Sequence, residues 1–174
     1  MSENLDPLGK VTEDKDLLGK IRGFLAGFSG YFDRDRRREA DMLLRETVAQ
    51  RYEEQWERIS SLQRDLIKAS QLEYVDDLEA SAIKLRAFID RVKGASHGYA
   101  GLFDHIRINS EELEKLYQYD LSLLQNVERV THAIDNVGAS LETDGLPAAL
   151  RNLETVSQES VDAFNRRDEL LLSQ

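Results

Sequence analysis

The chain has 174 residues, of which 41% are hydrophobic and 32% charged, and its formal net charge is −10. This length suits a single domain, and this composition suits long amphipathic helices whose outer faces carry many charges. The net charge argues against nucleic acid as the main partner. The absence of cysteine excludes disulfides, thiolate nucleophiles and cysteine-ligated metal sites within the chain.

The N-terminal stretch contains Pro7 and Gly9. We therefore expect residues 1–11 to be a mobile tail, followed by one helical-bundle domain over residues 12–174. There is no basic start followed by an apolar stretch, and no apolar run reaches about 18 residues. These features favour a cytoplasmic protein, with the inner face of the membrane as a second location.

The first helix is expected to begin at Thr12, whose hydroxyl can cap an acidic first turn. In helical phase, the bulky residues between Leu17 and Phe32 fall within about 140° of arc. Glycines cluster on another side of the same helix: Gly19, Gly23, Gly27 and Gly30. The pattern predicts a helix that has one bulky face and one bare face and that reaches Asp33.

A charged junction, DRDRRR, follows at residues 33–38, with Asp33 as a possible helix cap. Its basic residues, together with two from the preceding helix, could contact an anionic surface. These candidate residues are Lys20, Arg22, Arg34, Arg36, Arg37 and Arg38. The favoured interpretation is that acidic neighbours cancel the cluster, because Asp33, Asp35, Glu39 and Asp41 stand beside it.

Further helices are expected from the junction to about Ala69, from about Gln71 to Ile108, from Asn109 past Val137, and from Pro147 to the end. Ser70 begins an S-x-x-E capping box, which predicts a turn there. Gly145 is expected to stop the helix before Pro147. No strand alternation is found. The sequence predicts an all-α fold: an elongated up-and-down bundle of four long helices plus the glycine-rich N-terminal helix.

The sequence contains none of the metal-binding, catalytic or phosphate-binding motifs that were considered. The three histidines do not form the paired Glu-x-x-His motifs of a di-metal bundle. No G-x-S-x-G elbow and no phosphate-binding GxxxxGK[ST] loop occurs. Glu128 and His132 stand four residues apart and are interpreted as a surface pair. We expect no enzyme activity, no catalytic residue, no cofactor, no metal and no small-molecule ligand.

A glycine-rich septet occurs twice, as GFSGYFD at 27–33 and GYAGLFD at 98–104. Each glycine in an exposed helix costs about 1 kcal/mol relative to alanine, so a compensating contact is expected. Three interpretations stay open: internal packing, a partner or self-association surface, and a membrane-surface helix at residues 14–32. The candidate surface comprises Gly23, Gly27, Gly30, Phe32, Asp33, Gly94, Gly98, Gly101, Phe103 and Asp104.

The pattern G-[FY]-[SA]-G-x-F-D resembles uncharacterised bacterial all-helical proteins that share this cluster. The resemblance covers the two septets and implies no activity. From the residues themselves we expect a non-enzymatic helical scaffold or interaction module that binds a protein partner or self-associates through glycine-lined helix faces. The alternative is a peripheral membrane protein that uses residues 14–38.

Overall fold

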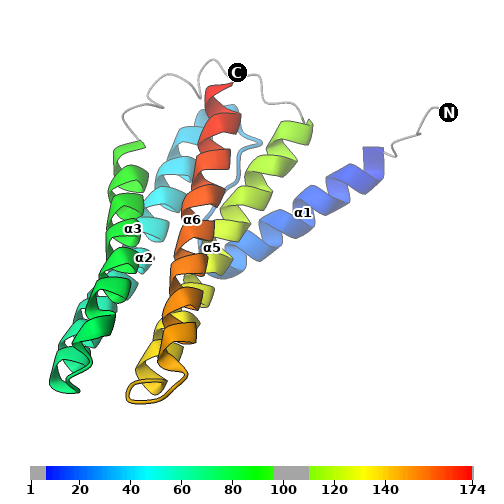
Figure 1. The fold of residues 1–174 in the computed structure, drawn as a ribbon. Coiled ribbons are helices and arrows are strands. Elements are labelled where there is room, and N and C mark those ends of the chain that lie inside the picture. Colours follow the sequence, from blue (N-terminus) through cyan, green and yellow to red (C-terminus); the bar gives the residue numbers. More distant parts are fainter. Residues whose placement is uncertain (1–6, 96–109, 174) are drawn as a thin grey trace.

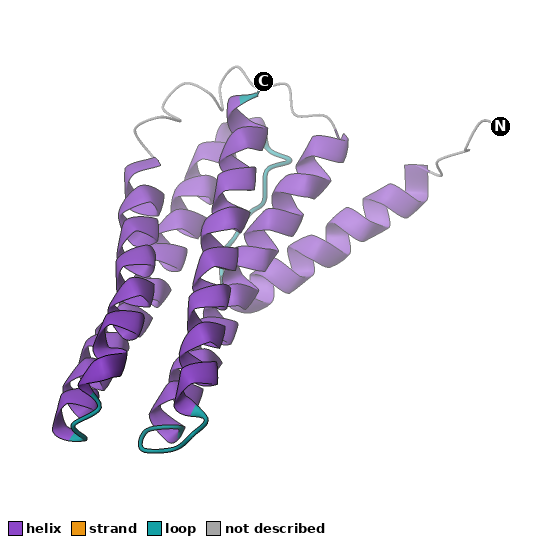
Figure 2. Cartoon of the chain, viewed as in Figure 1, coloured by secondary structure: helices purple, strands orange, loops and turns teal. Residues whose placement is uncertain are grey.

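The computed structural model describes residues 7–95 and 110–173, and within these ranges the chain is helical with no strand (Figure 1, Figure 2). The helices are α1 (Pro7–Phe24), α2 (Arg37–Lys68), α3 (Val75–Gly94), α5 (Ser110–Ala139) and α6 (Leu146–Leu172). Two short 3-10 turns, η1 (Arg34–Arg36) and η2 (Leu72–Tyr74), precede α2 and α3. The predicted all-α fold is confirmed.

The four long helices α2, α3, α5 and α6 form an elongated bundle in which successive helices alternate in direction (Figure 1). Helix α2 packs against α3 and α5, and α6 packs against the same two helices. Helices α3 and α5 share few contacts and therefore lie diagonally across the bundle. Helix α1 packs mainly on α5, outside the bundle, and its N-terminal part points away from it.

The predicted apolar stripes form the core of the bundle. Side chains at three- and four-residue spacing share one face of a helix, which explains why they are buried together. The α2 stripe is buried throughout and consists of Leu44, Val48, Tyr52, Gln55, Ile59, Leu62 and Leu66. In α3 the corresponding residues are Leu78, Ala82, Leu85, Ile89 and Val92.

The turn predicted near Ser70 is present, but its chemistry differs from a capping box. Ser70 has a positive φ of 59°. The N–H of Gln71 donates to the carbonyl of Leu66 at 2.9 Å, and the N–H of Ser70 donates to Ile67 at 3.1 Å. This is the Schellman arrangement that ends a helix, with serine where glycine is usual. Ser70 thus terminates α2 and does not cap the next helix.

Three predicted boundaries are wrong. Helix α1 begins at Pro7, before the expected Thr12, and proline suits a first helical position. It ends at Phe24, well short of Asp33. Gly145 immediately precedes α6, whereas α5 already ends at Ala139. The helix expected to reach Ile108 is described to Gly94, and the second septet, including Gly98, Gly101, Phe103 and Asp104, lies outside the described residues.

Candidate functional site: the N-terminal arm and the buried network

The part of the chain before α2 is attached to the bundle by one side only, and we call residues 7–33 the arm. The arm comprises α1 and a non-helical loop, residues 25–33, which we call the latch loop. The bulky face predicted for the arm is buried along Leu18, Ile21, Leu25, Phe28 and Tyr31. Phe32 departs from this prediction, because 56% of it is exposed.

The latch loop leaves the helical path because two of its glycines adopt left-handed backbone. Gly27 has φ +82° and Gly30 has φ +80°, a backbone conformation that residues with a Cβ rarely adopt. The prediction that this septet ends a two-faced helix is therefore wrong. Leu25, Phe28 and Tyr31 are still buried, at intervals of three residues, but they are buried from a non-helical loop and not from a helix face.

Gly30 makes the one close approach among the candidate glycines that the structure describes. A Cβ at this position would lie 2.6 Å from the hydroxyl oxygen of Tyr117 in α5. That hydroxyl accepts a hydrogen bond from the backbone N–H of Tyr31 at 2.8 Å. The rings of Tyr31 and Tyr117 stack with centroids 5.4 Å apart. Gly30 thus lets the loop backbone approach α5 closely enough to dock Tyr31.

The remaining described glycines of the candidate surface, and Gly19 on the same side of α1, do not pack against another part of the chain. A Cβ added at Gly19, Gly23, Gly27 or Gly94 would meet nothing within 4 Å. Internal close packing, one of the three interpretations of the glycine pattern, is therefore wrong at these positions. Gly27 is explained by its left-handed backbone, whereas Gly19 and Gly23 lie on the solvent-facing side of α1.

The basic residues near the arm are largely engaged by local groups. The Nε of Arg22 donates to the carbonyl of Phe28 at 2.9 Å, and the Nε of Arg37 donates to the carbonyl of Tyr31 at 2.5 Å. Two ion pairs join Lys20 to Asp16 at 2.9 Å and Arg36 to Asp33 at 3.6 Å. Arg38 is exposed, and Arg34 begins η1. Two of the six candidate residues are therefore paired with carboxylates, and two others are held by backbone carbonyls.

Asp33 has the capping role that the sequence predicts. Its backbone is extended, and its carboxylate accepts a hydrogen bond from the N–H of Asp35 at 3.1 Å. It therefore caps η1, which leads directly into α2 at Arg37.

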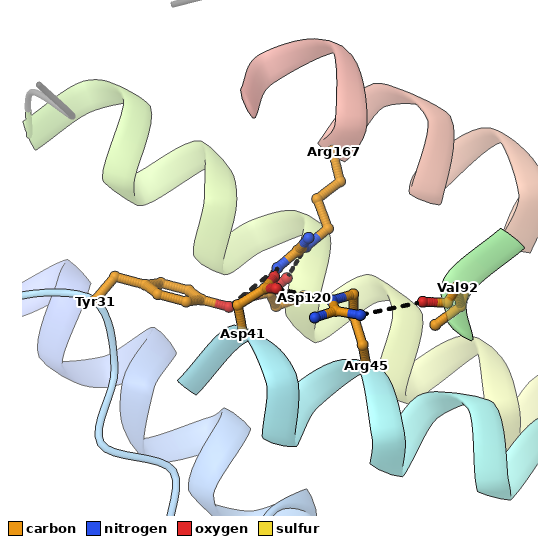
Figure 3. A network of polar contacts seen from close by, with 6 residues as sticks. All are labelled: Tyr31, Asp41, Arg45, Val92, Asp120 and Arg167. Carbon is orange, nitrogen blue, oxygen red and sulfur yellow. Dashed lines mark hydrogen bonds and ion pairs between the residues drawn. The ribbon is translucent and has the colours of Figure 1, made fainter. Parts of the chain in front are cut away.

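A buried polar network joins the latch loop to the bundle (Figure 3). Arg167 of α6 is fully buried and binds two carboxylates. Its Nη2 lies 2.5 Å from Oδ1 of Asp41 in α2, and its Nε lies 2.6 Å from Oδ1 of Asp120 in α5. The hydroxyl of Tyr31 donates to the other oxygen of Asp120 at 2.5 Å. One arginine and one tyrosine thus connect the arm, α2, α5 and α6.

Arg45 extends the network to the remaining helix of the bundle. Its Nε donates to Oδ2 of Asp41 at 2.7 Å, and its Nη1 reaches the carbonyl of Val92 in α3 at 3.4 Å. The cluster therefore contains two guanidinium groups and two carboxylates. Burying such charges is costly unless they are paired and hydrogen-bonded. Each of the two guanidinium groups is paired with at least one carboxylate, which reduces that cost.

Burial changes the acid–base properties of the network. Removal from water raises the pKa of Asp120 to about 6, and this effect outweighs the opposing attraction of Arg167 and the hydrogen bond from Tyr31. The pKa of Tyr31 is also raised, first by burial and then by the nearby charge of Asp120. Asp120, Tyr31 and Arg167 have no exposed surface. The network therefore ties the arm to the bundle, and it offers a substrate no access.

Sequence reasoning missed this network, although a signal was present. The sequence places Asp41 among the acidic neighbours expected to cancel the arginine cluster, but in the structure it is buried against Arg45 and Arg167. Asp120 stands between the core residues of α5, and Arg167 stands three residues after a buried Phe164. Charged residues at core positions of several helices are the pattern that could have indicated it.

Metal-ligand clusters and membrane-spanning helices were sought in the part of the chain that the structure describes. No group of three or more potential metal ligands comes together there. Among the same residues, no helix has the length and the apolar character required to cross a bilayer. Comparison with protein-family models, with curated proteins and with solved structures found no match to the chain.

Proposed function

We propose that this chain is a non-enzymatic helical interaction protein that self-associates through the outward face of α1. One observation carries the proposal. Leu18 and Ile21 attach α1 to the bundle, whereas Gly19 and Gly23 face solvent with nothing within 4 Å of an added Cβ. The arm thus presents a bare helix face outside a bundle that is already packed.

The spacing of these two glycines supports a helix as the partner. Gly19 and Gly23 are four residues apart, so they lie on one side of α1. Small residues at this spacing let a second backbone approach closely. Each glycine costs about 1 kcal/mol relative to alanine inside an exposed helix. Contact with the α1 face of a second copy would offset that cost.

The direct test is the molar mass of the protein by light scattering over a range of concentrations. The wild type is expected to show a concentration-dependent dimer. Leucine has a better helix propensity than glycine, so the double variant Gly19→Leu, Gly23→Leu should keep its fold. It should remain a monomer, because the new side chains block close approach. Asn152→Leu, at an exposed position of α6, is the matched control and should dimerise as the wild type does.

Two results would contradict the proposal. A wild type that stays monomeric at every concentration would exclude self-association, and a dimer that survives both leucines would exclude this face. Cross-linking gives an independent measurement, because the chain contains no cysteine. Under mild oxidation Gly23→Cys should form a disulfide-linked dimer, whereas Asn152→Cys should not.

Peripheral membrane binding through residues 14–38 is the second proposal. It is favoured by Phe32, which is 56% exposed in the latch loop close in sequence to the basic residues. The local pairing of Lys20, Arg22 and Arg36 weakens it. Co-sedimentation with vesicles, with and without anionic lipid, tests it. Absence of binding to anionic vesicles at low salt would reject it.

A further inference from the structure

The latch loop closes over a buried carboxylate. Asp120 has no exposed surface, and its two oxygens are bonded by Arg167 from the bundle and by Tyr31 from the arm. Figure 3 shows the Tyr31 side chain reaching from the loop toward this group. Departure of the arm would remove one of these two partners and would open the site to water.

We propose that the latch loop is a proton-sensitive latch, in which uptake of a proton by Asp120 favours the arm docked on α5. Closing the arm removes the carboxylate from water, which disfavours its charged form. A proton that binds more tightly when the arm is closed must itself favour closure. This response of the arm does not depend on self-association.

Charged and polar groups around Asp120 determine how readily its carboxylate takes up a proton. Arg167 of α6 lies 2.6 Å away and favours the charged form. Asp41 of α2 bears a like charge that favours the neutral form, and Arg45 partly balances it. From the arm, Tyr31 donates a hydrogen bond that also favours the charge. Among the described residues of α3, the group that reaches the network is the uncharged Val92 carbonyl.

The net shift in the pKa of Asp120 determines whether acid favours the closed or the open position of the arm. The pKa of Asp120 is raised from 3.8 to about 6, with burial as the largest cause. A group whose pKa is raised in the closed state contributes stability that is fully present below its ordinary pKa. That contribution is lost as the pH rises through the raised value. The arm is therefore held most tightly in acid and is released more readily above about pH 6.

The construction of the arm allows such a movement without unfolding of the bundle. Helix α1 packs mainly on α5, while the four bundle helices pack on one another. The latch loop contains two left-handed glycines, Gly27 and Gly30. Glycine backbone has access to many conformations at little steric cost, so the loop can change direction there.

The test measures the distance between the arm and the bundle. Spin labels at Gly23→Cys and Asn152→Cys report this distance by pulsed electron resonance, and labels at Glu57→Cys and Asn152→Cys report a control distance within the bundle. All three positions are exposed, and the chain has no other cysteine. A label at Gly23 also blocks the proposed self-association face, so the reading comes from a single chain.

A single short arm distance is expected at pH 4.5, with a second, longer population appearing at pH 8. Over this range the equilibrium constant for closure should fall by up to about a hundredfold, the change that corresponds to the pKa difference of Asp120. The bundle distance should not change. An arm distance that is the same at both pH values would overturn the proposal.

Two variants assign the response to its residue. Asp120→Asn is neutral at every pH, so the arm distance should lose its pH dependence. Asp135→Asn changes an exposed carboxylate of the same helix and should keep the wild-type response. A pH response that persists in Asp120→Asn would also overturn the proposal. If Asp120→Asn does not fold, Tyr31→Phe serves as a second variant, because it keeps the ring and removes the hydroxyl. Tyr31→Phe should enlarge the open population at pH 8. An unchanged open population in this variant would also overturn the proposal.

Discussion

Replacing Gly30 by alanine should destabilise the protein far more than the same change at Gly27, although both glycines have nearly the same backbone conformation. Their φ angles are +80° and +82°. Left-handed backbone costs a residue with a Cβ about 1–2 kcal/mol. Nothing lies within 4 Å of a Cβ at Gly27, so this strain is the only effect that Gly27→Ala is expected to have on the folded state.

At Gly30 a second effect is added. The new Cβ would lie 2.6 Å from the hydroxyl oxygen of Tyr117 and 3.2 Å from a methyl group of Leu18. Tyr117 must move, and the buried N–H of Tyr31 then loses this acceptor. Loss of a partner by a buried polar group costs about 1–3 kcal/mol. The total for Gly30→Ala is therefore about 2–5 kcal/mol.

Urea unfolding followed by circular dichroism measures both variants. Either alanine restricts the unfolded chain in the same way, so that contribution cancels when the two are compared. We expect the midpoint of Gly30→Ala to fall well below that of Gly27→Ala, with unchanged denaturant dependence. Equal losses of stability in the two variants would show that the docking of the loop on Tyr117 contributes nothing.

Four further variants test other parts of the structure by the same unfolding measurement. At low protein concentration, Gly19→Ala and Gly23→Ala should each raise the free energy of unfolding by about 1 kcal/mol, since both are uncovered helix positions; a loss would mean that these glycines are packed. Arg167→Met should cost about 3–5 kcal/mol, because it removes the cation bound to Asp120; a neutral effect would show that the network is dispensable. The stability advantage of the wild type over Asp120→Asn should shrink as the pH rises from 4 to 7, because the raised pKa of Asp120 favours folding only while the group is protonated. This change in the stability difference is about 3 kcal/mol at most, which corresponds to a rise in the pKa of Asp120 from 3.8 to about 6. A stability difference that stays constant or grows with pH would show that folding does not raise the pKa of Asp120.

The helices of the bundle could be predicted from the sequence because their signal is local. Spacing of three and four residues along α2, from Leu44 to Leu66, identifies both the helix and its buried face. The order of the helices in space could not be obtained in this way. Spacing along one helix does not say which other helix covers its buried face, and the structure places α3 diagonally from α5.

The latch loop shows why periodicity can mislead. Leu25, Phe28 and Tyr31 continue the helical spacing and are indeed buried, but the backbone that carries them is not helical. The left-handed angles at Gly27 and Gly30 depend on where Tyr31 docks in the folded protein. Glycine permits such angles but does not require them, so the sequence alone leaves both paths open.

The buried network was beyond local reasoning for a related reason. A charged residue at a core position is stable only with partners, and the partners of Arg167 come from α2, α5 and the arm. Periodicity places Asp41, Asp120 and Arg167 on inward faces, but it says nothing about which of them meet. Their pairing depends on the lateral order of the helices, which the sequence analysis did not determine.

The network also has a consequence for the order of folding. Arg167 is separated from Asp41 by 126 positions in the chain and from Tyr31 by 136, so these contacts close some of the longest loops in the protein. Contacts within the α2–α3 and α5–α6 hairpins join much closer residues and can form first. We therefore expect the charges to meet late, after the rate-limiting step. Weakening them should accelerate unfolding and leave the refolding rate nearly unchanged, so the network acts mainly on the lifetime of the folded protein.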